Sequence, residues 1–301
     1  MKKFLLLIVM IFLAGCAGSV PAQPNYYEPP IEDEESLPHG TDPQLTEPPI
    51  EEMTPQATEP PTPAPATLPP PPPPTTIPPP PPAAGVGIPI LMYHTSSEHN
   101  PGALAELYVR PSEFERQMVW LIENNFTFVT FDDWNYLHLI DRPIMITFDD
   151  GYKENYTEIF PILQKHNVTI VLFLTWNSIA NHGITQEMLL TMHNSGLVSI
   201  ESHSMTHPNL ANISDNETRL RRELAESRDR IYELTGRAPI AIAYPAGASN
   251  ARVIEIASEY YQFGLRHDRG MHNTNISDFQ IQRIRISRST GLNTFIRLVS
   301  Q

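Results

Sequence analysis

Cysteine is almost absent from this sequence, because Cys16 is the only one among its 301 residues. An intramolecular disulfide is therefore excluded, and any folded part must be stable through its apolar core. Cys16 ends the segment "MKKFLLLIVMIFLAGC", which has a basic start and then an apolar run that is short for a membrane span. This pattern is typical of a secretory signal peptide.

The residues Leu13–Cys16, "LAGC", resemble the lipobox of bacterial lipoproteins. On this interpretation the signal peptide, residues 1–15, is removed and Cys16 becomes the lipid-modified first residue. Stable attachment needs more than one acyl chain. We then expect an extracytoplasmic lipoprotein that is anchored to a membrane of a bacterial cell envelope. The alternative is an ordinary signal peptide with an incidental cysteine.

Lysine and arginine are absent from residues 17–83, which hold 24 of the 32 prolines and ten acidic side chains. The prolines include unbroken runs at 69–74 and 78–82. Such a segment cannot bury enough apolar surface to fold, and proline runs adopt an extended helix. We expect residues 16–83 to form a lipid-anchored, disordered and semi-rigid linker. A proline-rich ligand for another domain is disfavoured, because no basic residue flanks the runs.

A strongly basic surface is also lacking. Of the formal charge of -14, about -6 belongs to residues 84–301 once Lys2, Lys3 and the ten acidic linker residues are set apart. A mildly acidic domain argues against nucleic acid as a partner. About 215 residues suffice for one domain with a single core, and we expect a monomer.

From residue 87 onward, apolar strands without polar alternation are separated by helical patterns. Strands are expected at 87–94, 126–131, 143–148, 168–176, 197–202, 240–244, 263–266 and 284–287, and helices at 111–125, 132–140, 153–166, 185–194, 214–235, 249–262 and from 291. This order predicts an α/β fold whose parallel sheet is covered on both faces. No glycine fingerprint for a dinucleotide follows the first strand, which favours a closed barrel over an open doubly wound sheet.

Polar side chains end or directly follow several predicted strands: His94, Asp149 with Asp150, His203 and Tyr244. Each alone has an ordinary explanation, since a lone histidine is usually a core residue and "DDG" is a common turn. Catalytic residues of barrels gather at the carboxyl ends of the strands, so the combination indicates an active site.

The segment "HSMTH" places His203 and His207 four residues apart. On a helical turn, this spacing brings both imidazoles to one face, where they can reach one ion. Two imidazoles and a carboxylate leave positions open for water and substrate, as catalytic zinc requires. If Asp150 is that carboxylate, Asp149 lies beside the ion in the position of a general base. Gly151 permits the sharp turn that both side chains need.

Two motifs, "TFDDGY" (147–152) and "HSMTH" (203–207), resemble those of the polysaccharide deacetylases of carbohydrate esterase family four, the NodB-homology family. The resemblance covers roughly residues 88–290. It implies a distorted parallel (β/α)7-type barrel that hydrolyses N-acetyl groups of sugar polymers. It also implies that Asp149 is the catalytic base and that Asp150, His203 and His207 hold a metal, usually Zn²⁺ or another divalent transition metal.

A third motif of the family, Arg-Pro-Pro-Tyr-Gly, is replaced here by residues 243–247, "AYPAG". The arginine that steadies the base in the family is therefore missing. Arg283 and Arg285 are candidates for that role from their place in the chain. The resemblance assigns the oxyanion contact to the backbone N–H of Ala246, with Tyr244 in support.

Two histidines compete for the role of the catalytic acid. The strand "PILMYH" resembles the permuted branch of biofilm poly-N-acetylglucosamine deacetylases, in which a Tyr-His strand end supplies the acid, and this favours His94. His267 in "GLRHD" is the alternative.

The resemblance implies an N-acetylated glycan polymer of the cell envelope or the extracellular matrix as the substrate and partner. Peptidoglycan, a β-1,6-linked exopolysaccharide and chitin-like oligomers all stay open. Two other functions compete with N-deacetylation. The missing arginine favours a non-catalytic glycan-binding pseudoenzyme, and the same metal chemistry suits an amidase acting on a non-carbohydrate substrate.

Overall fold

The computed structural model describes residues 87–99, 102, 104–267 and 270–300. The predicted signal peptide and the proline-rich linker lie outside these residues. Among the helices of the described part, none combines the length and the apolar character needed to cross a bilayer.

The strands are short and mostly buried, as expected for a sheet that is covered on both faces. They are β1 Gly87–Ile88, β2 Ile90–Tyr93, β3 Thr95–Ser96, β4 Tyr108–Val109, β5 Thr127–Phe128, β6 Pro143–Phe148, β7 Ile170–Leu174, β8 Val198–Ser202, β9 Ala241–Ala243, β10 Phe263–Leu265, β11 His272–Asn273 and β12 Ile284–Arg285. Eight strands form one sheet in the order β10-β9-β8-β7-β6-β2-β12, with β5 paired to the start of β6. All pairs in this sheet are parallel.

The two edge strands of this sheet are joined by the segment that leads into β12. Leu265 of β10 forms a parallel bridge with Ile281, and the N–H of Arg266 donates to the Ile281 carbonyl at 2.8 Å. A few residues later, β12 pairs with β2. One segment therefore contacts both edges, and the sheet curls into the distorted barrel that the sequence predicts.

Pairing within the sheet is shortest between β8 and β9, whose one backbone pair is Ser202 with Ile242. The buried carboxylate of Glu201 takes over part of this ladder by accepting the N–H groups of Ile240 and Ala241, at 2.7 and 2.9 Å. Arg237 donates to the same carboxylate at 2.8 Å. Burial raises the pKa of Glu201 and these donors oppose the shift.

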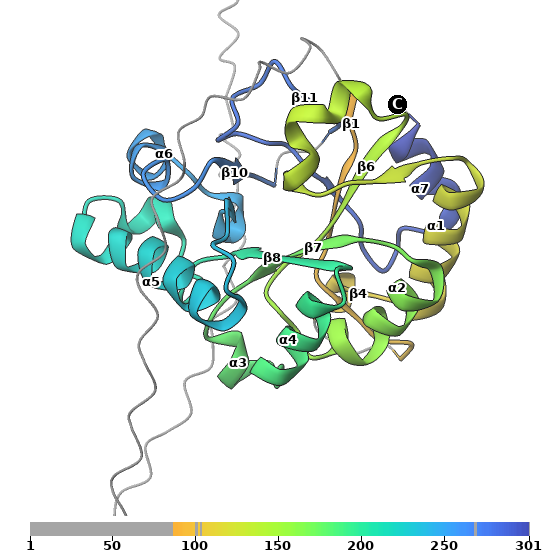
Figure 1. The fold of residues 1–301 in the computed structure, drawn as a ribbon, viewed down its shortest axis with the longest axis horizontal. Coiled ribbons are helices and arrows are strands. Elements are labelled where there is room, and N and C mark those ends of the chain that lie inside the picture. Colours follow the sequence, from red (N-terminus) through yellow and green to blue (C-terminus); the bar gives the residue numbers. More distant parts are fainter. Residues whose placement is uncertain (1–86, 100–101, 103, 268–269, 301) are drawn as a thin grey trace, which may run out of the picture. The chain divides into compact units, whose positions relative to one another are not determined.

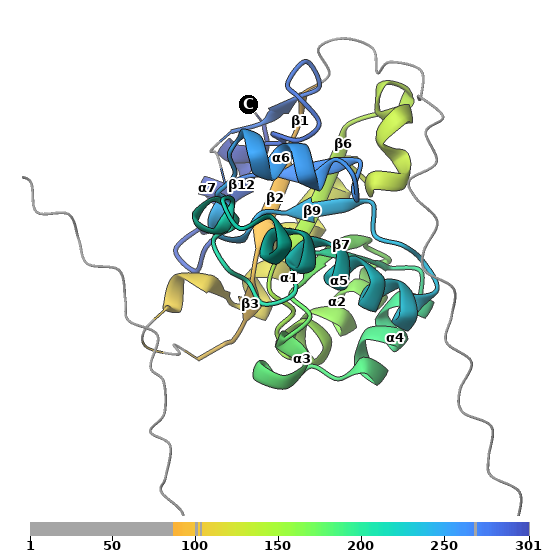
Figure 2. The ribbon, with the colours of Figure 1, turned by 90° about the vertical axis from the view of Figure 1, so that its left-hand side faces the viewer.

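The helices cover the outside of the sheet (Figures 1 and 2). They are α1 Pro111–Glu123, α2 Phe160–His166, α3 Ser178–Asn181, α4 Gln186–Asn194, α5 Glu217–Thr235, α6 Ala251–Ala257 and α7 Leu292–Val299. Helices α1, α2, α4 and α7 bury apolar side chains in one cluster with the outward residues of β6 and β7, such as Ile146 and Leu172. Helices α5 and α6 pack in a second cluster that includes Ile242 of β9.

Alternation along β6 decides which side chains enter the barrel. Ile144, Ile146 and Phe148 point outward into the helix-covered cluster, whereas Met145 belongs to the interior cluster. Because strand side chains alternate, Thr147 and Asp149 share the inner face with Met145. The polar end of β6 is therefore directed into the barrel, which positions the site described below.

Two predicted helices are present but differ from an α-helix in type. The helix expected over 153–166 begins as a π-helical turn, Asn155–Ile159, before α2, and Pro161 explains why an α-helical hydrogen bond is lost there. The helix expected over 132–140 is a 3₁₀ helix, Phe131–Leu139, and Thr130 caps it. Asp133 accepts the N–H of Thr130 at 2.9 Å and completes a capping box.

Candidate active site

The carboxyl ends of the parallel strands meet at one end of the barrel. His94 follows β2, Asp149 and Asp150 follow β6, and His203 follows β8. Parallel pairing of neighbouring strands brings these residues to the same rim. The structure thus assembles side chains that are separated by up to 109 residues in the chain.

The carboxylate of Asp149 forms a bidentate ion pair with Arg283. One guanidinium nitrogen donates to Oδ1 at 2.7 Å and the other to Oδ2 at 2.8 Å. Neither side chain is exposed to solvent. Arg283 comes from the segment between the Ile281 bridge and β12, so the candidate that was selected by chain position lies against the predicted base.

Further contacts fix the guanidinium of Arg283. It donates to Thr147 Oγ1 at 3.1 Å and to the carbonyl of Arg266 at 3.2 Å. Thr147 in turn donates to the carbonyl of Leu91 at 2.8 Å. Thr147 was not among the predicted site residues, although a hydroxyl two residues before Asp149 in an otherwise apolar strand is a usable signal for a group on the same face.

Burial raises the pKa of Asp149, but the positive charge of Arg283 and then that of His203 outweigh it. The resulting pKa lies well below the ordinary value of 3.8. Asp149 is therefore ionised throughout the neutral range and can accept a proton.

The two adjacent aspartates point to different partners because the backbone turns sharply after β6. Asp150 adopts a left-handed conformation with φ of 73°, and Gly151 follows with φ of 80°. A side chain at Gly151 would overlap Leu174 and Ser178, with the nearest atom 2.5 Å from the added carbon. Glycine is thus required both for its conformation and for space.

Asp150, His203 and His207 form the group of potential metal ligands found among the described residues, with ligand atoms within 4.8 Å of one another. Oδ1 of Asp150 lies 3.4 Å from Nε2 of each histidine. Nδ1 of His203 lies 2.7 Å from the carbonyl of Ala243, which requires a proton on Nδ1 and leaves the Nε2 lone pair directed at the group. The side chains of His203, Asp150 and His207 are 2%, 14% and 36% exposed, so the group opens to solvent at His207.

The segment between the two histidines is not the helical turn that the spacing predicts. Ser204 and His207 both have left-handed backbones, with φ of 68° and 61°. The N–H of His207 donates to Ser204 Oγ at 3.0 Å instead of continuing a helix. The imidazoles nevertheless meet, with ring centres 4.8 Å apart, because the two bends direct both rings toward Asp150.

The charges in this group perturb one another. Burial raises the pKa of Asp150, but the hydrogen bond and charge of His203 lower it below its ordinary value. Burial lowers the pKa of His203, but Asp149 and Asp150 raise it above 6.5. Burial and then His203 lower the pKa of His207 to about 4. A neutral His207 can donate its lone pair to an ion at neutral pH.

Both candidates for the acid lie within electrostatic range of Asp149. His94 is 8% exposed, and its carbonyl accepts a hydrogen bond from the buried side chain of Asn155 at 3.0 Å. Burial lowers its pKa, and Asp149 opposes that shift. Burial and then Arg283 lower the pKa of His267 to about 4. His267 packs so closely on Gly247 that an added side chain there would overlap it.

The turn after β9 presents backbone rather than side chains. Gly247 donates its N–H to the carbonyl of Tyr244 at 2.8 Å, and Ala246, at the exposed tip, has φ of 55°. The side chain of Tyr244 is fully buried with α5 and α6, and its hydroxyl donates to the carbonyl of Phe279 at 3.3 Å. Tyr244 can therefore support the oxyanion contact only through its backbone.

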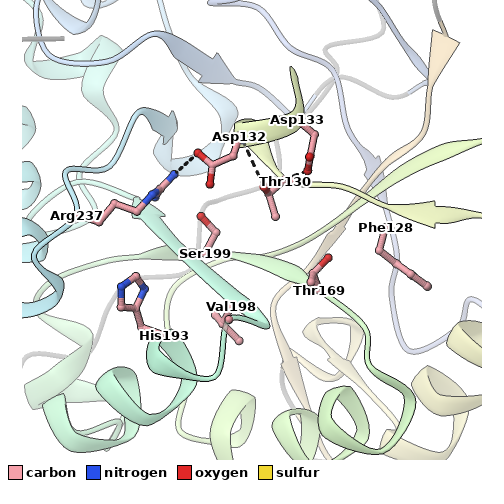
Figure 3. Close-up of a pocket in the computed structure, with 10 residues that line it drawn as sticks. Phe128, Thr130, Asp132, Asp133, Thr169, His193, Val198, Ser199 and Arg237 are labelled. Carbon is pink, nitrogen blue, oxygen red and sulfur yellow. Dashed lines mark hydrogen bonds and ion pairs between the residues drawn. The ribbon is translucent and has the colours of Figure 1, made fainter. Parts of the chain in front are cut away.

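A polar pocket of about 310 Å³ lies at the opposite end of the barrel, beside the first residues of β7 and β8. Figure 3 shows Arg237 reaching across it to Asp132, a contact of 2.9 Å. Thr169, Val198 and Ser199 also line it. This pocket contains none of the residues that the sequence analysis proposed for catalysis.

Comparison with known proteins places these motifs in a family. The family model "polysaccharide deacetylase" matches residues 138–262. YxkH of Bacillus subtilis, a protein that carries the polysaccharide deacetylase name, is 30% identical over 215 residues, which cover 69% of this chain and 74% of YxkH. A poly-β-1,6-N-acetyl-D-glucosamine N-deacetylase of Staphylococcus aureus is 28% identical over 201 residues, which cover 60% of this chain and 68% of that protein.

The fold agrees with the sequence relationship. The crystal structure of a polysaccharide deacetylase from Bacillus cereus superposes with a TM-score of 0.67 at 28% identity, and the match covers 71% of this chain and 69% of that one. The motif residues 147–152 and 203–207 both fall inside the segment matched by the family model. The chain belongs to the polysaccharide deacetylase family.

Proposed function

We propose that this protein is a metal-dependent N-deacetylase that hydrolyses N-acetyl groups of an N-acetylglucosamine-containing polysaccharide and releases acetate. The observation that carries the proposal is the ion pair of Asp149 with Arg283 directly beside the Asp150, His203 and His207 group. A pseudoenzyme is disfavoured by this pair, because it holds a buried, ionised base next to potential metal ligands. The named activity of the Staphylococcus aureus relative supports the substrate class.

The ligand group suits a divalent ion in its donor chemistry. One carboxylate and two imidazoles are typical of catalytic zinc, and the tautomer of His203 is set by Ala243. We propose Zn²⁺ or a close substitute. Such an ion, when bound, would polarise the acetamide carbonyl and make water more acidic.

The chain's own residues would perform the proton transfers. Asp149 accepts a proton from the attacking water as its oxygen bonds to the acetyl carbon, and the Ala246 N–H donates to the oxygen on which charge develops. As the carbon–nitrogen bond breaks, His94 gives a proton to the nitrogen. Acetate leaves with the oxygen of the water, and the amine leaves with the proton that His94 gave. One water proton is released as the acetic acid ionises, and the other passes from Asp149, through solvent, back to His94 before the next turnover.

The proposal is tested by acetate release from defined oligomers. We expect the protein to release acetate from β-1,6-linked or β-1,4-linked N-acetylglucosamine oligomers, with the preferred linkage identifying the polysaccharide. Acetyl-lysine peptides serve as the comparison for an amidase on other substrates. If the zinc-loaded protein releases acetate from none of the oligomers, the proposal is refuted.

His203→Ala is expected to remove the metal, because it deletes a ligand whose orientation is fixed by a 2.7 Å hydrogen bond. A residue that only hydrogen-bonds to a metal ligand contributes about 10–100-fold to metal affinity. Because His203 is itself a proposed ligand, we expect its removal to lower metal affinity by more than about 100-fold. Metal content after dialysis and competition with a chelating dye measure it. Metal affinity equal to that of the unsubstituted protein would mean that the ion binds elsewhere.

Separate alanine variants distinguish the two acid candidates. We expect His94→Ala to lower the rate of acetate release by about 10²–10⁴-fold, the usual contribution of a positioned acid, while metal affinity is unchanged. His267→Ala should have the smaller effect, because the resemblance to the permuted branch assigns the acid to His94, the histidine at the end of the strand "PILMYH". Steady-state kinetics on both variants measure the difference, and the reverse order would assign the acid to His267.

We further propose that the protein acts outside the cytoplasm as a membrane-anchored lipoprotein of a bacterial cell envelope, as a monomer. The lipobox-like "LAGC" and the proline-rich residues 17–83 support this proposal. The linker would let the domain reach a polymer at a distance from the membrane. Incorporation of labelled fatty acid into the protein, and its loss in Cys16→Ser, tests the anchor.

A further inference from the structure

Glu223 on α5 is a buried carboxylate that belongs to none of the groups assigned above. Its residue is 1% exposed, and it lies on the face of α5 that packs toward β8. Its side chain is directed at the segment 203–207 that carries two of the proposed metal ligands. Burying a carboxylate lowers the stability of the protein unless hydrogen-bond donors contact its oxygens. The donors that contact Glu223 therefore indicate what it does.

Both oxygens of Glu223 bind one residue of that segment. Oε2 accepts the backbone N–H of Thr206 at 2.8 Å, and Oε1 accepts the Thr206 hydroxyl at 2.6 Å. The backbone carbonyl of Glu223 also accepts the N–H of Met205 at 3.1 Å. Three hydrogen bonds from a single helical residue therefore hold the two residues that immediately precede His207.

The segment held in this way is strained and lacks regular structure. Ser204 and His207 occupy left-handed backbone conformations that disfavour residues with a side chain. Such conformations persist only where the surroundings determine them. A long helix with a packed apolar face is a rigid support, and the charged acceptor strengthens its hydrogen bonds.

We propose that Glu223 is a positioning residue of the metal centre, which sets metal affinity by holding His207 at the distance from Asp150 and His203 that an ion requires. The inference rests on the proposed function, because it assigns the metal to these three residues. A positioning role of Glu223 differs from a purely structural role in its effect on metal affinity. Loosening the segment should weaken metal binding even while the barrel stays folded.

The test compares Glu223→Gln with Glu226→Gln in the full protein. Glutamine keeps the size of the side chain but replaces one acceptor oxygen by an NH₂ group, so at most one Thr206 donor keeps its acceptor and the negative charge of the acceptor is lost. Glu226 lies on the same helix with its side chain 50% exposed, and serves as the matched control. Zn²⁺ affinity is measured by competition with a chelating dye, and the melting temperature of the metal-free proteins is recorded alongside.

We expect Glu223→Gln to weaken Zn²⁺ binding by about 10–100-fold, which is the usual effect of losing a residue that orients a metal ligand. Glu226→Gln should change Zn²⁺ affinity by less than about twofold. At saturating Zn²⁺, the rate of acetate release by Glu223→Gln should return close to that of the unsubstituted protein. Thr206→Val, which removes the hydroxyl but keeps the N–H, should give a smaller loss in the same direction. If Glu223→Gln does not fold, the Zn²⁺ affinity of Thr206→Val tests the positioning role.

Unchanged Zn²⁺ affinity in Glu223→Gln, or in Thr206→Val if only that variant folds, would overturn the inference, even if the melting temperature fell. The proposed function would survive that result, provided that the unsubstituted protein binds Zn²⁺ and releases acetate. Conversely, an unsubstituted protein that neither binds Zn²⁺ nor releases acetate would refute the proposed function itself, and the inference that rests on it.

Discussion

Asp149→Asn is expected to lower the rate of acetate release by about 10²–10⁴-fold, the range that a general base contributes, while Zn²⁺ still binds. Asparagine has nearly the same shape, but its amide cannot take up the proton of the attacking water. Metal binding should persist because Asp150, His203 and His207 provide the ligands in this account. Turnover and metal content must therefore be measured on the same preparation.

Asp132→Asn is the control for this change. Asp132 lies at the opposite end of the barrel, where it pairs with Arg237 and is 64% exposed. Its substitution should leave acetate release unchanged. Asp149→Asn also leaves Arg283 with a poorer partner, so both variants are compared well below their melting temperatures. Full activity in Asp149→Asn would contradict the assignment of Asp149 as the base.

Arg283→Met is expected to reduce the free energy of unfolding by about 3–5 kcal/mol, because it leaves the buried Asp149 carboxylate without its charged partner. Both side chains are shielded from solvent, so water cannot replace the lost hydrogen bonds. Activity should fall as well, since Asp149 would no longer be fixed beside the metal ligands. Denaturant unfolding at pH 7 measures the change in stability.

Arg285→Met is the matched control, because Arg285 is exposed two residues further along the chain. Exposed substitutions usually change stability by less than about 0.5 kcal/mol. An unfolding free energy for Arg283→Met within that range of the unsubstituted protein would mean that the ion pair does not hold Asp149.

The pH dependence of stability gives a second readout for Arg283→Met. The pKa of Asp149 is depressed on folding below its ordinary value of 3.8, so its ion pair contributes stability above about pH 4 that is lost as the pH falls further. In Arg283→Met, burial opposes ionisation without that partner, and this contribution should shrink. The unsubstituted protein should therefore lose stability more steeply below about pH 4 than the variant.

The sequence predicted the parts of this molecule that depend on local pattern. The apolar run at 143–148 gave β6 with its observed bounds, and the turn at Asp149–Gly151 followed from two carboxylates and a glycine. The barrel followed from the alternation of strands and helices. The strands, the helices and this turn rest on interactions between residues near in sequence, whereas closure of the barrel rests on the pairing of β12 with β2, far apart in the chain.

The partner of Asp149 depended on strand register, which the sequence does not give. Arg283 and Arg285 are two residues apart and so share one face of the last strand segment. Arg285 pairs with Met92 near the rim, whereas Arg283 lies two residues deeper and extends up to Thr147 and Asp149. Only the paired sheet distinguishes the two arginines.

The support of the proposed metal ligands also depended on tertiary packing. The spacing of His203 and His207 suggested a helical turn. The segment between them is not helical, and Thr206 within it donates hydrogen bonds to Glu223 on α5. In the sequence, Glu223 is one of several acidic residues in a highly charged helix. Helical spacing from Leu220 and Leu224 could place Glu223 on the buried face of α5, but its partner Thr206 follows only from the packing of that helix.

The most direct test of the central claim is acetate release by the full protein before and after its metal is removed and restored. We expect release from N-acetylglucosamine oligomers by the Zn²⁺-loaded protein, loss of release in the metal-free protein, and recovery when Zn²⁺ is added back. His203→Ala should not recover under the same treatment. Acetate release that persists without metal, or that Zn²⁺ restores equally in His203→Ala, would contradict the account.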